Sequence, residues 1–62
     1  MQVEKYDDSD DFFSIFEHDT FDKQETIEAS GQIAAWRGYV DGKVVAGYNY
    51  TNDEGWYDDT VI

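Results

Sequence analysis

The stretch KQETIEASGQIAAWRGYVDGKVV, residues 23–45, decides between two folds. Small and apolar residues recur in it at alternating steps of three and four, which is the period of a helical face: Thr26, Ala29, Ile33, Trp36 and Val40. Asp22 and Glu25 have the spacing of a capping box, and Gly38 suits the left-handed position that follows a helix. This pattern predicts a helix over about residues 23–37.

The end of the same stretch favours a different structure. Asp41-Gly42 is a strong signal for a type I′ hairpin turn when residues that favour β-strands flank it. The flanking residues are of that kind: Tyr39, Val40, Val44 and Val45. In this interpretation residues 33–40 form a strand. Both structures stay open, because a helix that ends near Gly38 can lead into a tight turn and a strand.

The C-terminal part of the sequence favours strands over residues 43–51 and 56–62, with a turn at residues 52–55. Residues 1–6 show a weak period of two, and Ser9 suits the N-cap of a short helix. We therefore expect an α+β fold with one main helix at about 23–37. It packs on an antiparallel β-hairpin or meander at about 39–62, with an additional N-terminal strand or short helix.

The length and composition predict a single domain over residues 1–62. A chain of 62 residues is near the lower limit for independent folding, and it has no cysteine for disulfides or a thiolate zinc site. Its core must therefore consist of apolar side chains alone. The material is sufficient, because 40% of the residues are hydrophobic and 18% are aromatic.

The charge argues against direct binding to nucleic acid or to an anionic membrane. Fifteen acidic residues against four basic ones give a net charge of −11. A nucleic-acid-binding protein neutralises phosphates with clustered cations, whereas the cations here are scattered singly: Lys5, Lys23, Arg37 and Lys43. No apolar run reaches the roughly 20 residues of a membrane-spanning helix, and we expect no signal peptide, because acidic residues follow Met1 where a signal peptide would be basic. We expect a cytoplasmic protein, in the host cytoplasm if it is virally encoded.

Catalytic and metal-binding motifs are absent from the sequence. His18 is the only histidine, and no nucleophile motif surrounds any serine. A calcium loop that started at Asp7 would place Phe12 where glycine is required and His18 where a bidentate carboxylate is required. We therefore expect no enzyme activity, no cofactor and no dedicated metal site.

A dense set of carboxylates on a folded scaffold can reproduce the field of a nucleic acid. The leading hypothesis is a small inhibitor that mimics phosphates and blocks a basic nucleic-acid-handling protein, as phage-type inhibitors of restriction, CRISPR or polymerases do. The alternative is a generic or antitoxin-like interaction module that docks through a tyrosine-rich hairpin. The expected contact residues are Asp7, Asp8, Asp10, Asp11, Glu17, Asp19, Asp22, Glu25, Glu28, Asp53, Glu54, Asp58 and Asp59, together with Tyr48 and Tyr50.

Overall fold

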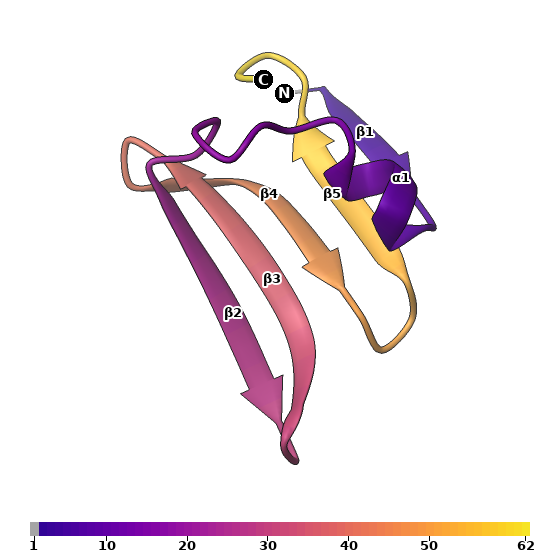
Figure 1. Cartoon of the computed structure of the whole chain (residues 1–62). Helices are drawn as coiled ribbons and strands as arrows, with labels where there is room; N and C mark the ends of the chain where they lie inside the picture. Colours follow the sequence, from indigo (N-terminus) through magenta and orange to yellow (C-terminus); the bar gives the residue numbers. More distant parts are fainter. Residues whose placement is uncertain (1) are drawn as a thin grey trace.

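The protein forms one antiparallel five-stranded sheet with a short helix on one face (Figure 1). The computed structural model describes residues 2–62. The elements in chain order are β1 (Val3–Tyr6), α1 (Ser9–Phe13), β2 (Lys23–Ala29), β3 (Gln32–Val40), β4 (Lys43–Asn49) and β5 (Glu54–Asp58). The strand order is β1-β5-β4-β3-β2, so β2 to β5 form a meander and β1 closes the sheet beside β5.

The predicted main helix, and with it the α+β fold class, is wrong. Residues 23–37 form β2 and most of β3, which pair directly, with Thr26 opposite Trp36. A turn separates the two strands because Ser30 and Gly31 adopt positive φ angles of 54° and 77°. The apolar steps of three and four are real, but strand pairing and burial of Trp36 outweigh a helical preference that Gly31 already weakens.

The hairpin signal at Asp41-Gly42 identified the correct local structure. Asp41 and Gly42 have φ angles of 53° and 77°, the left-handed pair that a type I′ turn requires, and they join β3 to β4. The Ser30-Gly31 turn has the same pair of positive φ angles. Two tight turns of matching twist therefore produce β2, β3 and β4 as a continuous meander.

The N-terminal segment contains both a strand and a short helix. The helix α1 has its N-cap at Asp8 instead of Ser9, because the Asp8 carboxylate accepts hydrogen bonds from the backbone N–H groups of Asp10 at 2.8 Å and Asp11 at 3.2 Å. The helix has five residues, far too few for stability in isolation, so its position depends on tertiary packing. No helix within residues 2–62 is long and apolar enough to cross a membrane.

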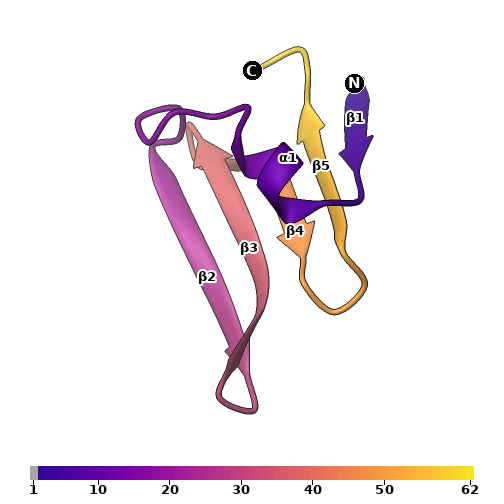
Figure 2. The same cartoon turned by 45° about the vertical axis from the view of Figure 1, so that its right-hand side comes forward.

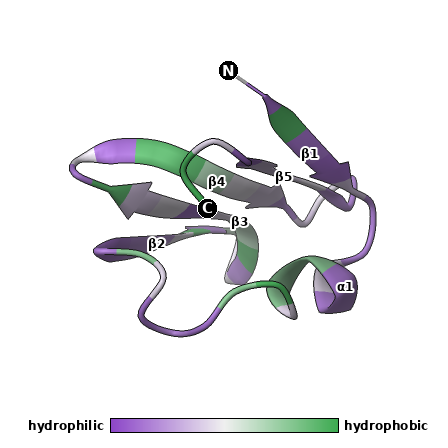
Figure 3. Cartoon of the chain, turned by 90° about the horizontal axis from the view of Figure 1, so that it is seen from above, coloured by the Kyte–Doolittle hydropathy of each residue, from purple (hydrophilic) through white to green (hydrophobic). Residues whose placement is uncertain are grey.

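The core lies between one face of the sheet and the layer formed by α1 and residues 14–22 (Figure 3). Phe12 of α1 is fully buried and forms its centre. Directly opposed residues across four strands share this covered face: Tyr6, Gly55, Tyr48 and Trp36. The opposite face, which we call the open face, has no covering segment among the described residues, as the edge-on view in Figure 3 shows.

Candidate protein-binding surfaces

Two acidic segments that are far apart in the sequence meet at one end of the sheet. Tyr6 at the end of β1 pairs with Gly55 near the start of β5, so the residues after Tyr6 lie beside the β4–β5 turn (Figure 2). We call this region the acidic end; it comprises Asp7, Asp8, Asp10, Asp11, Asp53 and Glu54. All six residues are exposed. All six are predicted contact residues, but their positions in the sequence do not show that they adjoin one another.

Tyr48 links the two segments of the acidic end. Its hydroxyl donates a hydrogen bond to Oδ1 of Asp53 at 3.1 Å. Burial is the main cause that raises the pKa of Tyr48. The hydrogen bond from Tyr48 to Asp53 and the negative charges of Asp53 and Asp8 raise this pKa further. The Tyr48 hydroxyl therefore interacts with carboxylates from both segments, so Asp8 and Asp53 both lie near it.

The carboxylates of the acidic end have no ion-pair partner among residues 2–62. The one salt bridge within that range joins Arg37 Nη1 to Glu25 Oε1 at 4.0 Å, and it lies on the open face. Instead, Asp8, Asp10 and Asp11 lie at the start of α1, where two backbone N–H groups bind the Asp8 carboxylate. The acidic end thus presents uncompensated negative charge on a locally ordered backbone.

The remaining predicted acidic contacts do not join this cluster. Asp58 lies at the other end of β5 and is buried, where its Oδ1 accepts hydrogen bonds from the Thr60 hydroxyl at 2.6 Å and the Thr60 N–H at 3.0 Å. These bonds lower the pKa of Asp58. Asp22 accepts a hydrogen bond from the Asp41 N–H at 2.8 Å and so fixes the β3–β4 turn. The others lie elsewhere: Glu17, Asp19 and Glu28 are exposed, whereas Glu25 and Asp59 are half-buried, and Oδ1 of Asp59 is buried without a hydrogen-bond partner among the described residues.

The tyrosine pair proposed for docking lies on the covered face. Tyr48 is 2% exposed, and Tyr50 stacks on Phe13 with 6.3 Å between ring centroids. Tyr48 lies on the α1 side of the sheet opposite Trp36, and Tyr50, which follows the end of β4, packs against the same core. The tyrosines therefore belong to the core layer, and Tyr48 has no exposed area with which to contact a partner.

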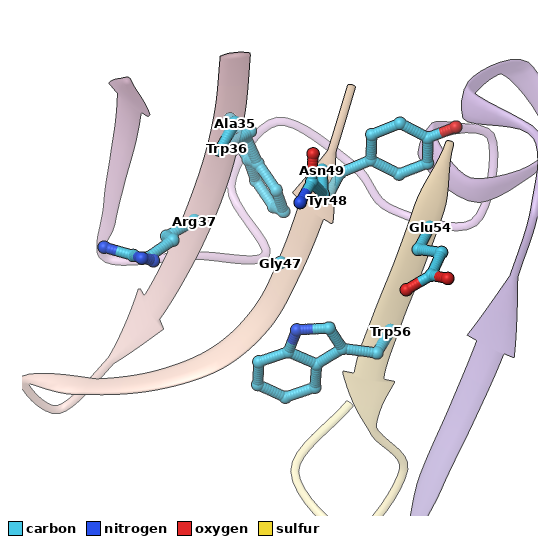
Figure 4. A pocket seen from close by; sticks show the side chains of 8 residues that line it. All are labelled: Ala35, Trp36, Arg37, Gly47, Tyr48, Asn49, Glu54 and Trp56. Carbon is cyan, nitrogen blue, oxygen red and sulfur yellow. The ribbon is translucent and has the colours of Figure 1, made fainter. Parts of the chain in front are cut away.

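The open face carries a row of five directly opposed residues, one from each strand, that the sequence analysis did not single out. From β2 to β1 they are Glu25, Arg37, Gly47, Trp56 and Lys5. The Trp56 indole lies against Gly47, where a Cβ atom would be 2.7 Å from Trp56 Nε1. Figure 4 shows the Arg37 side chain extending away from β4 and the indole reaching toward it, with a groove of about 290 Å³ along β4 between them. Only the strand register could have shown this row, because its members are distant in sequence.

Neither surface has the donor set of a metal site. Among residues 2–62 no group of three or more histidine, cysteine or acidic side chains is arranged to hold a metal ion. Comparisons with protein-family models, with curated proteins and with solved structures found no match.

We expect four tyrosines to ionise at a higher pH in the folded protein than in the unfolded chain, and their ionisation to destabilise the fold: Tyr39, Tyr48, Tyr50 and Tyr57. Their pKa values lie above the ordinary 10.0. The main cause for Tyr39 is its hydrogen bond to Glu25, and the main cause for Tyr48, Tyr50 and Tyr57 is burial. A pKa raised by folding adds stability that is complete below pH 10 and is lost as the pH rises through the folded values. Ultraviolet titration of tyrosinate with and without urea checks this. Equal midpoints in both states would contradict it.

Proposed function

We propose that this protein is a small, non-enzymatic inhibitor that binds a basic nucleic-acid-handling protein through its acidic end. In that complex its carboxylates occupy positions that phosphates of DNA or RNA would otherwise fill. The observation that carries the proposal is the convergence of the Asp7–Asp11 and Asp53–Glu54 segments into one exposed acidic cluster without ion-pair partners among residues 2–62. The proposal places the protein in the cytoplasm, and in the host cytoplasm if it is virally encoded.

The charge density supports a comparison with nucleic acid. A net charge of −11 over a longest extent of 33 Å amounts to about one charge per 3 Å. Duplex DNA carries about one per 1.7 Å, and a single strand about one per 3.4 Å. The protein therefore offers a basic cleft a field similar in density to that of a single strand, on a scaffold that does not need to be ordered at binding.

The test replaces the four carboxylates around the start of α1. Asn is suitable for Asp7, Asp8, Asp10 and Asp11, because Asn caps a helix as well as Asp does and the substitution removes charge without removing the N-cap. We expect the association rate with the partner to fall by about tenfold or more, because steering depends on the summed field. A matched control neutralises four carboxylates outside the acidic end: Glu17→Gln, Asp19→Asn, Glu28→Gln and Asp41→Asn.

The partner is first captured from a lysate of the source cells on the immobilised protein. We expect basic nucleic-acid-binding proteins that duplex DNA or RNA displaces and that salt releases, since exposed charges are screened over about 8 Å at physiological ionic strength. Interferometry with the purified partner then compares the two quadruple variants. Captured proteins that nucleic acid does not displace would refute the proposal. Equal loss of binding in both variants would refute the assignment to the acidic end.

A further inference from the structure

The whole net charge of the protein lies away from the open face. Strand positions on that face carry three cations, Lys5, Lys23 and Arg37, and three carboxylates, Glu25, Glu54 and Asp58. The other twelve carboxylates and Lys43 lie at other positions, and together they account for the −11. The open face is therefore electrically neutral on a strongly acidic molecule. It also carries the half-buried Trp56 ring.

This charge distribution limits how a molecule could cover the face. A nucleic acid would meet the long-range repulsion of a molecule of charge −11, and a basic protein would be drawn to the acidic residues elsewhere. A second copy meets the same long-range repulsion, which salt screens over about 8 Å, so its binding depends on short-range pairing across the two neutral faces. A second copy of this chain can approach only with its acidic surfaces turned outward, which means open face to open face. We propose that the open face is the interface of a symmetric dimer.

The central row of residues is complementary to itself about a two-fold axis parallel to β4. Such an axis reverses the order of the row, so each position of one copy faces its mirror position in the other. Glu25 of one copy then faces Lys5 of the second, Arg37 faces Trp56, and Gly47 faces Gly47 at the axis. Glu25 and Lys5 form an ion pair on each side of the axis. Each Trp56 indole lies over Gly47 of its own copy, so the two indoles, and not the glycine backbones, meet at the axis.

The monomer holds this row loosely enough for the side chains to reorient. Arg37 and Glu25 are 52% and 42% exposed, and their ion pair at 4.0 Å is long, so it contributes little to stability. Oε1 of Glu25 also accepts a hydrogen bond from the Tyr39 hydroxyl at 2.9 Å, which leaves Oε2 for a cation of a second copy. Lys5 is exposed as well. Long side chains of this kind also tolerate the crossing angle of about 30° at which two sheets pack.

The dimensions predict a weak dimer. Five strands at about 4.8 Å and about five residues at about 3.4 Å give a face of roughly 400 Å² per copy. Two such faces bury somewhat less than the area of about 1,000 Å² expected for a specific interface, so we expect a dissociation constant near about 100 µM. The inference does not depend on the function of the acidic end, because its carboxylates other than Glu54 lie off the open face.

The test is a charge exchange measured by sedimentation equilibrium between about 10 µM and 2 mM in about 0.15 M salt. We expect Glu25→Lys alone and Lys5→Glu alone each to weaken dimerisation about tenfold, and the double variant to return to within about threefold of the wild type. Within one copy these residues are four strands apart, roughly 19 Å, so recovery reports a contact between copies. Glu25→Lys also reduces the net charge, so a loss of dimer in this variant cannot come from added repulsion.

Matched controls make the same charge changes outside the open face. Glu17→Lys and Lys43→Glu should leave the dimerisation constant within about threefold of the wild type, because neither lies in the central row. Circular dichroism establishes that every variant is folded. A wild type that stays monomeric up to about 2 mM overturns the proposal. So does a folded double variant that fails to recover, or an assembly that grows beyond two copies.

Discussion

Replacing Phe12 by Ala is expected to unfold most of the protein at room temperature. Phe12 is fully buried at the centre of the core, and its ring contacts five other aromatic rings with centroid distances from 4.9 to 6.0 Å. Removing a buried phenylalanine ring costs about 3–5 kcal/mol, because apolar burial is lost and a cavity remains. A chain of this length has a free energy of unfolding of only about 3–9 kcal/mol, so the loss is comparable to the whole.

Urea denaturation followed by far-ultraviolet circular dichroism measures this effect. The control is Ile15→Ala, which removes a side chain that is 38% exposed on the segment after α1 and should cost less than about 1 kcal/mol. Phe12→Leu should be intermediate, because it retains most of the apolar volume. If Phe12→Ala keeps the wild-type urea midpoint, the helix does not hold the core together in the way the structure indicates.

Gly38→Ala is expected to destabilise the protein by about 1–3 kcal/mol through overpacking. A Cβ atom at Gly38 would lie 2.7 Å from Cδ1 and Cε1 of Phe21 and 2.8 Å from the Trp36 ring. Both rings are buried, with 8% and 7% of their residues' surface exposed, so neither can move without disturbing the layer above the sheet. Thermal unfolding should show a lower midpoint, with Phe21 displaced from its position.

Gly47→Ala provides the matched control. A Cβ atom there would also lie only 2.7 Å from a ring atom, but that atom is Nε1 of Trp56, on the open face. The half-buried indole can swing toward solvent, so the loss of stability should be clearly smaller than for Gly38→Ala. Equal losses in the two variants would mean that Trp56 is held as firmly as the core rings.

The correct and incorrect parts of the fold prediction have a common cause. Short-range turn chemistry was sufficient for Asp41-Gly42, because only residues that tolerate positive φ suit that turn. The same logic applied to Ser30-Gly31 would have divided the predicted helix, but serine is a weaker signal than aspartate or asparagine at that position. The period of three and four along residues 26–40 then favoured a helix, since Trp36 and Val40 are apolar in either structure.

The binding surfaces show a similar division. The abundance of exposed carboxylates could be inferred from composition, because there are too few cations to pair with them and a small core cannot contain them. The joining of Asp8 and Asp53 at one end could not be inferred, because it depends on which strand lies beside β5. Tyr48 illustrates the opposite case: an amphipathic ring suggests a contact surface, yet its hydroxyl reaches Asp53 while the ring is buried.

The amino-acid sequence alone established a small acidic chain with an aromatic core, a tight turn at Asp41-Gly42 and no motif for catalysis. These features depend on composition and on contacts between near neighbours, which a linear pattern contains. The register between strands decided the rest: it placed Trp56, Lys5, Lys23 and Arg37 on the neutral open face and Tyr48 in the core. Register is a long-range property, and a shift of one residue would exchange the two faces, so no local pattern contains it.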